Sequence, residues 1–356
     1  MPTLLIVLTG IFAVNKEPAA PPTIKSFAAP YPSLTSGSIE RLDPALDRII
    51  APDAKLEKVA EGFDWSEGPV WVSKGRGATT AAGTGFLLFS DIPPNTIYKW
   101  TEGIGVTVFM RPCGYHGDRT DMKEPGTNGL TLDKAGNLVM CQHGDRRLAK
   151  LASWSTPQGK QVVLADKYDG QRFNSPNDLA YHPSGDLFFT DPPYGLAKNV
   201  DDPGKELPFQ GIFRLDTKGK VHLLYKDLER PNGLAFSPDG KTLYVANSHP
   251  PRAIWMAFDV KADKTLGEGR VLFDATELVK TRKGLPDGLK VDKTGNIFAT
   301  GPGGVFVFSK QGKHLGTILT GEATANCAFG GDGGTLYITA DMYLARIRLQ
   351  TKGRVP

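Results

Sequence analysis

A repeated segment is the feature that most limits the folds open to this chain. Each copy starts with Asn or Asp, runs through alternating apolar residues to a Gly eight positions later, and continues into a second apolar run. Alternation with period two is typical of half-buried strands, and a Gly-containing turn between two such runs makes a hairpin. The first residues of the five regular copies, here called anchors, are Asn128, Asn177, Asn232, Asp287 and Asn326. A sixth, looser copy has its anchor at Glu67 and resumes at Phe86 after an insertion.

The spacing of the anchors predicts a single propeller. Consecutive anchors are 39 to 61 residues apart, and a four-stranded propeller blade needs about 40–50 residues. The composition agrees, because Gly and Pro supply 41 and 27 of the 356 residues and both interrupt helices. An array of β-sandwiches with coincidental similarity is the alternative, and the constant offset of eight argues against it. We therefore predict an all-β chain with one six-bladed β-propeller over residues 54–352.

The segment before the propeller is predicted to be a disordered or cleaved leader. Residues 4–14 are apolar but too few to span a bilayer, which suits the core of a signal peptide over residues 1–20. Residues 21–53, which begin rich in Pro and Ala, are expected to be a linker or N-terminal extension. We expect export to the periplasm or outside and no stable membrane insertion of the mature chain. No Lys or Arg precedes the apolar run, so a cytoplasmic protein remains the alternative.

Charge and cysteine content exclude several partner classes. Lys and Arg number 42 against 38 Asp and Glu, and they are scattered rather than clustered, whereas a nucleic-acid surface needs clustered basic residues. The three cysteines form no CxxC pair and predict neither a disulfide framework nor a zinc site. We expect no nucleic-acid partner, a small-molecule substrate, and a monomer or dimer.

The anchors are expected to form a ring in the central channel, because the first strand of each propeller blade lines that channel. The ring then contains two carboxylates, four amides and no soft ligand, and hard cations such as Ca²⁺ prefer oxygen donors of this kind. Asn-Gly and Asp-Gly are also common turn dipeptides. The anchors could therefore simply mark turns, but a turn does not explain Glu67-Gly68-Pro69 or Asn177-Asp178. We therefore predict that the ring holds a divalent cation.

A second set of polar residues is expected at the same mouth, because the second strand of each blade returns to the level of the anchor. The residues that end the second strands are Asp91, His143, Asp191, His249, Gly301 and Asp341. Two polar loops, residues 111–127 and 169–176, reach this side as well. Converging polar groups in a concavity are the default hypothesis for a binding site. From these groups we predict that Asn128, Arg172, Asp191 and His116 bind substrate.

Several short motifs beside the anchors carry a family resemblance. They are SEGPVW (66–71), FSDIPPN (89–95), SPNDL (175–179), FFTDPPYG (188–195), RPNGL (230–234) and LPDGL (285–289). At these residues the sequence resembles the gluconolactonase and senescence-marker-protein family, which includes regucalcin-like proteins. The resemblance implies a six-bladed propeller with a divalent metal, usually Ca²⁺ and otherwise Zn²⁺, Mg²⁺ or Mn²⁺. It also implies metal ligands at Glu67, Asn177, Asn232 and Asp287.

The expected function is metal-dependent hydrolysis of a sugar lactone, in which water attacks the ring carbonyl. Asp287 or His143 is expected to take the proton from water, and the residues alone do not decide between them. The absence of a GxSxG motif argues against an ordinary serine esterase. The main alternative is a non-catalytic, metal-containing propeller that binds a sugar acid or a peptide at the channel mouth. Phosphotriester hydrolysis is a third, weaker alternative.

Overall fold

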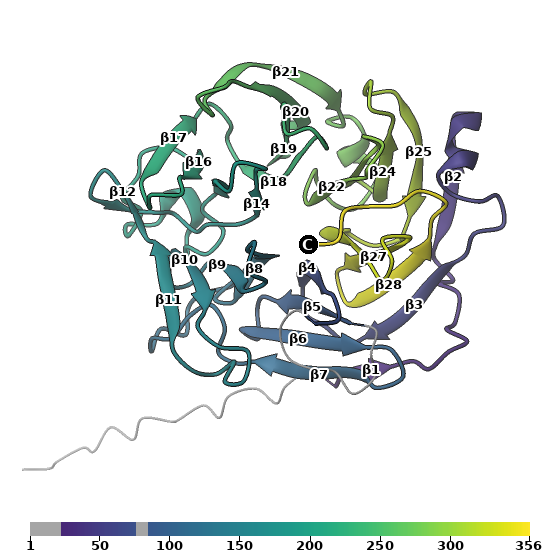
Figure 1. The fold of residues 1–356 in the computed structure, drawn as a ribbon, viewed down its shortest axis with the longest axis horizontal. Helices are drawn as coiled ribbons and strands as arrows, with labels where there is room; N and C mark the ends of the chain where they lie inside the picture. Colours follow the sequence, from purple (N-terminus) through teal and green to yellow (C-terminus); the bar gives the residue numbers. More distant parts are fainter. Residues whose placement is uncertain (1–22, 76–84) are drawn as a thin grey trace, which may run out of the picture.

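Six antiparallel sheets surround a central channel in the computed structural model, which describes residues 23–75 and 85–356 (Figure 1). The prediction of an all-β, six-bladed propeller is confirmed. The predicted signal peptide, residues 1–20, lies outside the described residues, and so does most of the insertion before Phe86. Each of these sheets is one blade, and in blades 1 to 4 the strands follow the chain outward from the channel.

The first three blades are regular four-stranded sheets. Blade 1 contains β4 (Ser66–Val72), β5 (Phe86–Asp91), β6 (Thr96–Thr101) and β7 (Gly105–Met110). Blade 2 contains β8 (Thr127–Leu132), β9 (Leu138–Gln142), β10 (Arg147–Leu151) and β11 (Gln161–Ala165). Blade 3 contains β14 (Leu179–Tyr181), β15 (Leu187–Asp191), β16 (Gly211–Leu215) and β17 (Val221–Tyr225). A small hairpin of β12 (Lys167–Tyr168) and β13 (Gln171–Arg172) joins blades 2 and 3.

Blade 4 is also regular, whereas blades 5 and 6 take extra strands from the start of the chain. Blade 4 contains β18 (Pro231–Phe236), β19 (Thr242–His249), β20 (Arg252–Val260) and β21 (Leu266–Asp274). Blade 5 contains β22 (Leu289–Val291), β23 (Ile297–Gly301), β24 (Gly304–Phe308), β25 (His314–Leu319) and β2 (Ser38–Arg41). Blade 6 contains β26 (Asn326–Gly330), β27 (Thr335–Ala340), β28 (Tyr343–Arg348), β3 (Leu56–Glu61) and β1 (Lys25–Ser26). The ring therefore closes with strands from both ends of the chain.

Helical structure in the described residues is limited to three short 3₁₀ turns, η1 (Pro44–Arg48), η2 (Asn199–Asp201) and η3 (Leu278–Lys280). Within residues 23–75 and 85–356, no helix has the length and apolar character needed to cross a bilayer.

Residues 23–53 differ from the predicted linker, because they pack against the propeller. β2 pairs with β25 at the outer edge of blade 5, and β1 pairs with β3 at the outer edge of blade 6. Their apolar side chains enter the core, and Leu46 and Ile50 are fully buried. The Pro- and Ala-rich composition concealed this, and the partner of β2 is far away in the sequence, since Ser38 pairs with Leu319.

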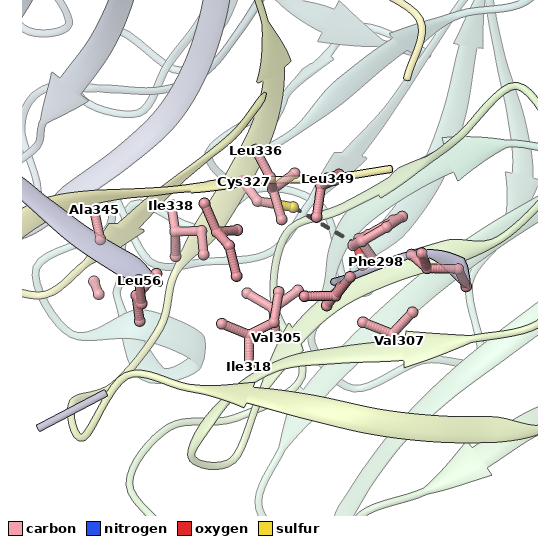
Figure 2. Close-up of a cluster of buried hydrophobic side chains, with 14 of the residues drawn as sticks. Leu56, Phe298, Val305, Val307, Ile318, Cys327, Leu336, Ile338, Ala345 and Leu349 are labelled. Atoms are coloured by element: carbon pink, nitrogen blue, oxygen red, sulfur yellow. Dashed lines mark hydrogen bonds between the residues drawn. The ribbon is translucent and has the colours of Figure 1, made fainter. Parts of the chain in front are cut away.

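The hydrophobic core lies between neighbouring blades. Figure 2 shows one such layer, between blades 5 and 6, where Val305 and Ile318 from blade 5 face Ile338 and Ala345 from blade 6. The Cys327 thiol lies in this layer and donates to the Phe298 carbonyl at 3.7 Å. All three cysteines are buried and free. This packing holds the blades rigidly around the channel, where the inner strands present the anchors.

Candidate active site

The anchors stand at equivalent positions at the start of the six inner strands. Glu67, Asn128, Asn232 and Asn326 lie in the first two residues of β4, β8, β18 and β26, while Asn177 and Asp287 lie two residues before β14 and β22. The constant distance of eight residues from each anchor to the Gly of the following turn therefore reflects the equivalent position of the anchors on their strands.

One cavity of about 470 Å³ gathers the predicted metal ligands. Its lining includes all four residues that the resemblance implied as ligands, and Asn128 as well. The ring anchors that line it are Glu67, Asn128, Asn177, Asn232 and Asp287. The rest of the wall is made mainly by Trp65, Glu124, Tyr194, Arg230, Ser248, Arg282, Lys283 and Thr324.

Three oxygens of the anchors are buried without a hydrogen-bond partner among the described residues. They are Asn128 Oδ1, Asn177 Oδ1 and Asp287 Oδ1. Leaving such a group unpaired costs about 1–3 kcal/mol each, so native structures rarely tolerate several together without a ligand. All three atoms are hard oxygen donors of the kind that Ca²⁺ takes. The residues present therefore fit a divalent cation.

The buried carboxylates of the ring also favour binding of a divalent cation. Burial raises the pKa of Glu67 to about 7, although the Gly68 N–H and Asn326 Nδ2 both donate to its carboxylate. Burial raises the pKa of Asp287 as well, and the charge of Glu67 adds to that effect. Two buried carboxylates near each other need protons or a cation to compensate their charge. Within the described ranges, no three or more His, Cys, Asp or Glu side chains are grouped so that they could hold a metal ion by themselves, so a cation here depends on amide oxygens beside the carboxylates.

Side-chain hydroxyls on the second strands hold the anchors in place. Ser90 Oγ donates to the Asn128 carbonyl of the next blade at 2.7 Å, and Thr190 Oγ1 donates to the Asn232 carbonyl at 2.7 Å. Ser248 links two predicted ligands: its Oγ accepts from Asn232 Nδ2 at 2.9 Å and donates to the carbonyl of Pro286, next to Asp287. These bonds connect blade 1 to blade 2, blade 3 to blade 4 and blade 4 to blade 5 at the level of the ring.

Close approach of the inner strands explains the glycine after most anchors. A Cβ on Gly129 would lie 2.7 Å from the Asn177 carbonyl oxygen, and one on Gly233 would lie 2.4 Å from the Asp287 carbonyl oxygen. These two glycines lie inside strands β8 and β18 and have no positive φ. The dipeptides Asn128-Gly129 and Asn232-Gly233 are therefore not turns, and the glycine leaves room for the next anchor.

Asp191 lies outside the cavity lining. Its carboxylate accepts the backbone N–H groups of Asn174 and Ser175, both at 2.8 Å, and it is fully buried. Burial raises its pKa to about 7 despite these donors. Asp91 accepts the Trp65 N–H at 2.8 Å in the equivalent place in blade 1. Both side chains therefore bind the segment that leads into an anchor, and the cavity lining gives no support to substrate binding by Asp191.

Arg172 and His116 also lie outside the cavity lining and meet at Asp145. The Arg172 guanidinium donates to the Asp145 carbonyl at 3.0 Å, and His116 Nδ1 lies 2.6 Å from Asp145 Oδ2. The Arg172 backbone N–H donates to Glu206 at 2.7 Å. Of the four predicted substrate-binding residues, the structure brings only Asn128 into the cavity.

His143 stands behind the cavity wall. Its side chain is completely buried, with Nε2 3.4 Å from Asn177 Nδ2 and Nδ1 3.3 Å from Glu124 Oε2. Glu124 does line the cavity. Sequence reasoning singled out the loop of residues 111–127 but not this glutamate within it. It likewise missed Tyr194 and Arg230, although both fall inside the motifs DPPYG and RPNG.

Comparisons with known proteins agree with this site. A family model described as the SMP-30/Gluconolactonase/LRE-like region matches residues 65–341. A gluconolactonase from Zymomonas mobilis is 39% identical over 334 residues, which cover 90% of this chain and 88% of the relative. A solved gluconolactonase structure from Xanthomonas campestris superposes with a TM-score of 0.75 at 29% identity and covers 92% of this chain and 99% of that one.

A more distant structure shares the fold alone. Regucalcin from Agrobacterium tumefaciens, described as a calcium-binding protein, superposes with a TM-score of 0.61 at 22% identity and covers 82% of this chain and 92% of that one. The family model and the gluconolactonase relative confirm the resemblance inferred from the six motifs.

Proposed function

Because the chain belongs to the SMP-30/gluconolactonase/LRE-like family, we propose that it hydrolyses a sugar lactone in a reaction that depends on a divalent metal. One observation carries this proposal. Glu67, Asn177, Asn232 and Asp287 line a single cavity, and two of them present buried oxygens without a hydrogen-bond partner in the described part of the chain. The volume of about 470 Å³ lies in the range of small-molecule sites.

Glu67, Asn177, Asn232 and Asp287 would hold the cation, and Ca²⁺ matches an all-oxygen set better than Zn²⁺ does. When bound, the metal would polarise the lactone carbonyl as a Lewis acid and stabilise the negative charge that develops on its oxygen. The Ser90, Thr190 and Ser248 hydrogen bonds hold the anchor backbones before any ligand arrives, so little reorganisation is needed at the site.

The cavity walls supply groups that suit a polyhydroxylated ring. Arg230 and Asn128 offer donors, and Tyr194 offers a hydroxyl that stays protonated because burial raises its pKa. Trp65 adds an apolar face to the same wall. We propose that these four residues orient the sugar hydroxyls while the carbonyl faces the ring of anchors.

Attack by water requires a proton acceptor that reaches the cavity. Asp287 lines the cavity, but a carboxylate that binds a cation is a weak base, because the positive charge favours its ionised form. His143 is fully buried and does not line the cavity, so it has no direct access to the water molecule.

A pH-indicator assay over a panel of lactones tests the proposal. The panel contains glucono-δ-lactone, other aldonolactones and pentonolactones, and each is measured before chelation, with chelator, and after Ca²⁺ is added back. We expect acid release that chelator abolishes and Ca²⁺ restores. Turnover of none of these lactones, together with tight binding of a sugar acid, would instead identify a non-catalytic binding propeller.

A further inference from the structure

Glu124 is the acidic group of the cavity that neither the ring of anchors nor the backbone uses. It lies in the loop between β7 and β8, lines the cavity, and keeps 32% of its side chain exposed. The His143 imidazole lies 3.3 Å behind it and is completely buried. A group must reach the substrate to exchange a proton with it. We propose that Glu124 is the general base of the lactonase and that His143 is the residue that positions it.

The surroundings of Glu124 suit this role. Within residues 23–75 and 85–356, no Lys or Arg forms a salt bridge with its carboxylate, whereas the cavity residues Arg282 and Lys283 pair with Glu40 and Glu322. His143 is the ionisable group in contact with it, and the other ionisable groups of the same cavity are Glu67, Tyr194, Arg230, Arg282, Lys283 and Asp287. Burial is the main cause of the raised pKa of Asp287 and of Tyr194, and the charge of Glu124 contributes to both. Glu124 is thus close to the ring without belonging to it.

His143 connects Glu124 to the ring. One edge of the imidazole lies 3.3 Å from Glu124, and the opposite edge lies 3.4 Å from the amide of Asn177. A Cβ on Gly195 would lie 2.7 Å from the His143 Cβ, so this glycine lets the segment after β15 pack directly on the histidine. The imidazole therefore lies between the Glu124 carboxylate and a predicted metal ligand, and its Nδ1 is buried with no hydrogen-bond partner among the described residues, so a small shift of Glu124 would give it one.

The reaction balances with Glu124 as the only proton carrier. Water gives a proton to the Glu124 carboxylate as its oxygen bonds to the lactone carbonyl carbon. The ring C–O bond then breaks, and the same proton passes to the departing ring oxygen, which becomes a hydroxyl of the open sugar acid. Glu124 returns to its carboxylate form, and no co-reactant is consumed. The new carboxylic acid ionises in solution.

This inference rests on the proposed lactonase function. Substitution of Glu124 tests the assignment of the base separately from the function itself. Glu124→Gln keeps the size of the side chain and removes the base. We expect kcat to fall by roughly 10²–10⁴-fold, with Ca²⁺ affinity and the melting temperature unchanged. Glu61→Gln is the matched control, because Glu61 is 31% exposed and pairs with Lys58 away from the cavity. We expect it to keep wild-type kcat.

The other possible results distinguish a failure of the proposed lactonase function from a failure of the assignment of Glu124 as the base. If the wild-type protein hydrolyses no lactone, the proposed function fails. If the wild type is active and Glu124→Gln keeps its kcat, only the assignment of the base is overturned. For His143→Gln, measured at saturating Ca²⁺, we expect lower kcat and a displaced acidic limb in the pH profile of kcat/KM. A His143→Gln enzyme that loses stability but keeps the wild-type pH profile would show that the histidine is only structural.

Discussion

At the scale of single residues, the site depends on pairs of neighbours in the chain. Each anchor has a side-chain oxygen, and the glycine that follows most anchors lets the next inner strand come close. Asn232 and Gly233 are such a pair, since a residue with a Cβ at position 233 would collide with the carbonyl of Asp287. The dipeptide therefore reflects packing around the channel rather than a turn.

Gly233→Ala should disturb the ring of anchors directly. The new Cβ would lie 2.4 Å from the Asp287 carbonyl oxygen. Because this oxygen belongs to the backbone and not to a flexible side chain, the backbone of one of the two strands must move. Overpacking of this kind typically costs about 1–3 kcal/mol, and we expect at least a tenfold loss of Ca²⁺ affinity by calorimetry. Gly267→Ala on β21 is the control, because its nearest contact would be an ordinary 3.5 Å. Equal Ca²⁺ affinity in the two variants would contradict this account of the glycine.

At the scale of strands and loops, the ends of the second strands hold the anchors of the next blade. Ser90, Thr190 and Ser248 do so through hydroxyls, while Asp91 and Asp191 bind the backbone that leads into an anchor. The sequence could place these residues at the level of the ring, because strand direction follows from the repeat. It could not show whether a polar residue at a strand end serves the backbone or a ligand, because that depends on contacts between blades.

Thr190→Val tests the connection between blades. Valine keeps the shape of threonine and removes the donor to the Asn232 carbonyl, 2.7 Å away. Loss of a residue that supports a metal ligand typically costs 10–100-fold in affinity, and we expect Ca²⁺ binding to weaken within that range while the far-ultraviolet circular dichroism spectrum is retained. Thr131→Val on β8 provides the comparison, because Thr131 does not line the cavity. Unchanged affinity in Thr190→Val would show that the Thr190 hydroxyl is not needed to hold Asn232.

At the scale of the whole molecule, the repeat accounts for the propeller but not for its N-terminal cover, residues 23–53. The six anchors and their offset predicted the blades and the gathering of the anchors at the channel, since a repeated register places equivalent residues around one channel. The packing of residues 23–53 could not be predicted, because β2 finds its partner in β25. This segment also reaches the site: Glu40 of β2 lies 3.1 Å from Arg282, which lines the cavity.

Removal of this cover should weaken both the fold and the site. A chain that starts at residue 54 loses the buried side chains of Leu34, Leu46, Ile49 and Ile50, and each is worth about 1.5–3 kcal/mol when fully buried. Compared with a chain that starts at residue 23, we expect a free energy of unfolding lower by several kcal/mol in urea titrations and a raised KM. Identical urea midpoints would mean that residues 23–53 add nothing to the stability of the propeller.

The measurement that tests the central claim most directly is the rate of glucono-δ-lactone hydrolysis as Ca²⁺ is titrated into chelator-treated protein. It is made side by side for the wild type and Asp287→Asn. We predict a rate near the uncatalysed background before Ca²⁺ is added, hyperbolic recovery in the wild type, and at least a tenfold higher half-saturating Ca²⁺ concentration in the variant. Full activity in the chelated wild type, or the same Ca²⁺ dependence in both proteins, would contradict a metal-dependent lactonase centred on this ring.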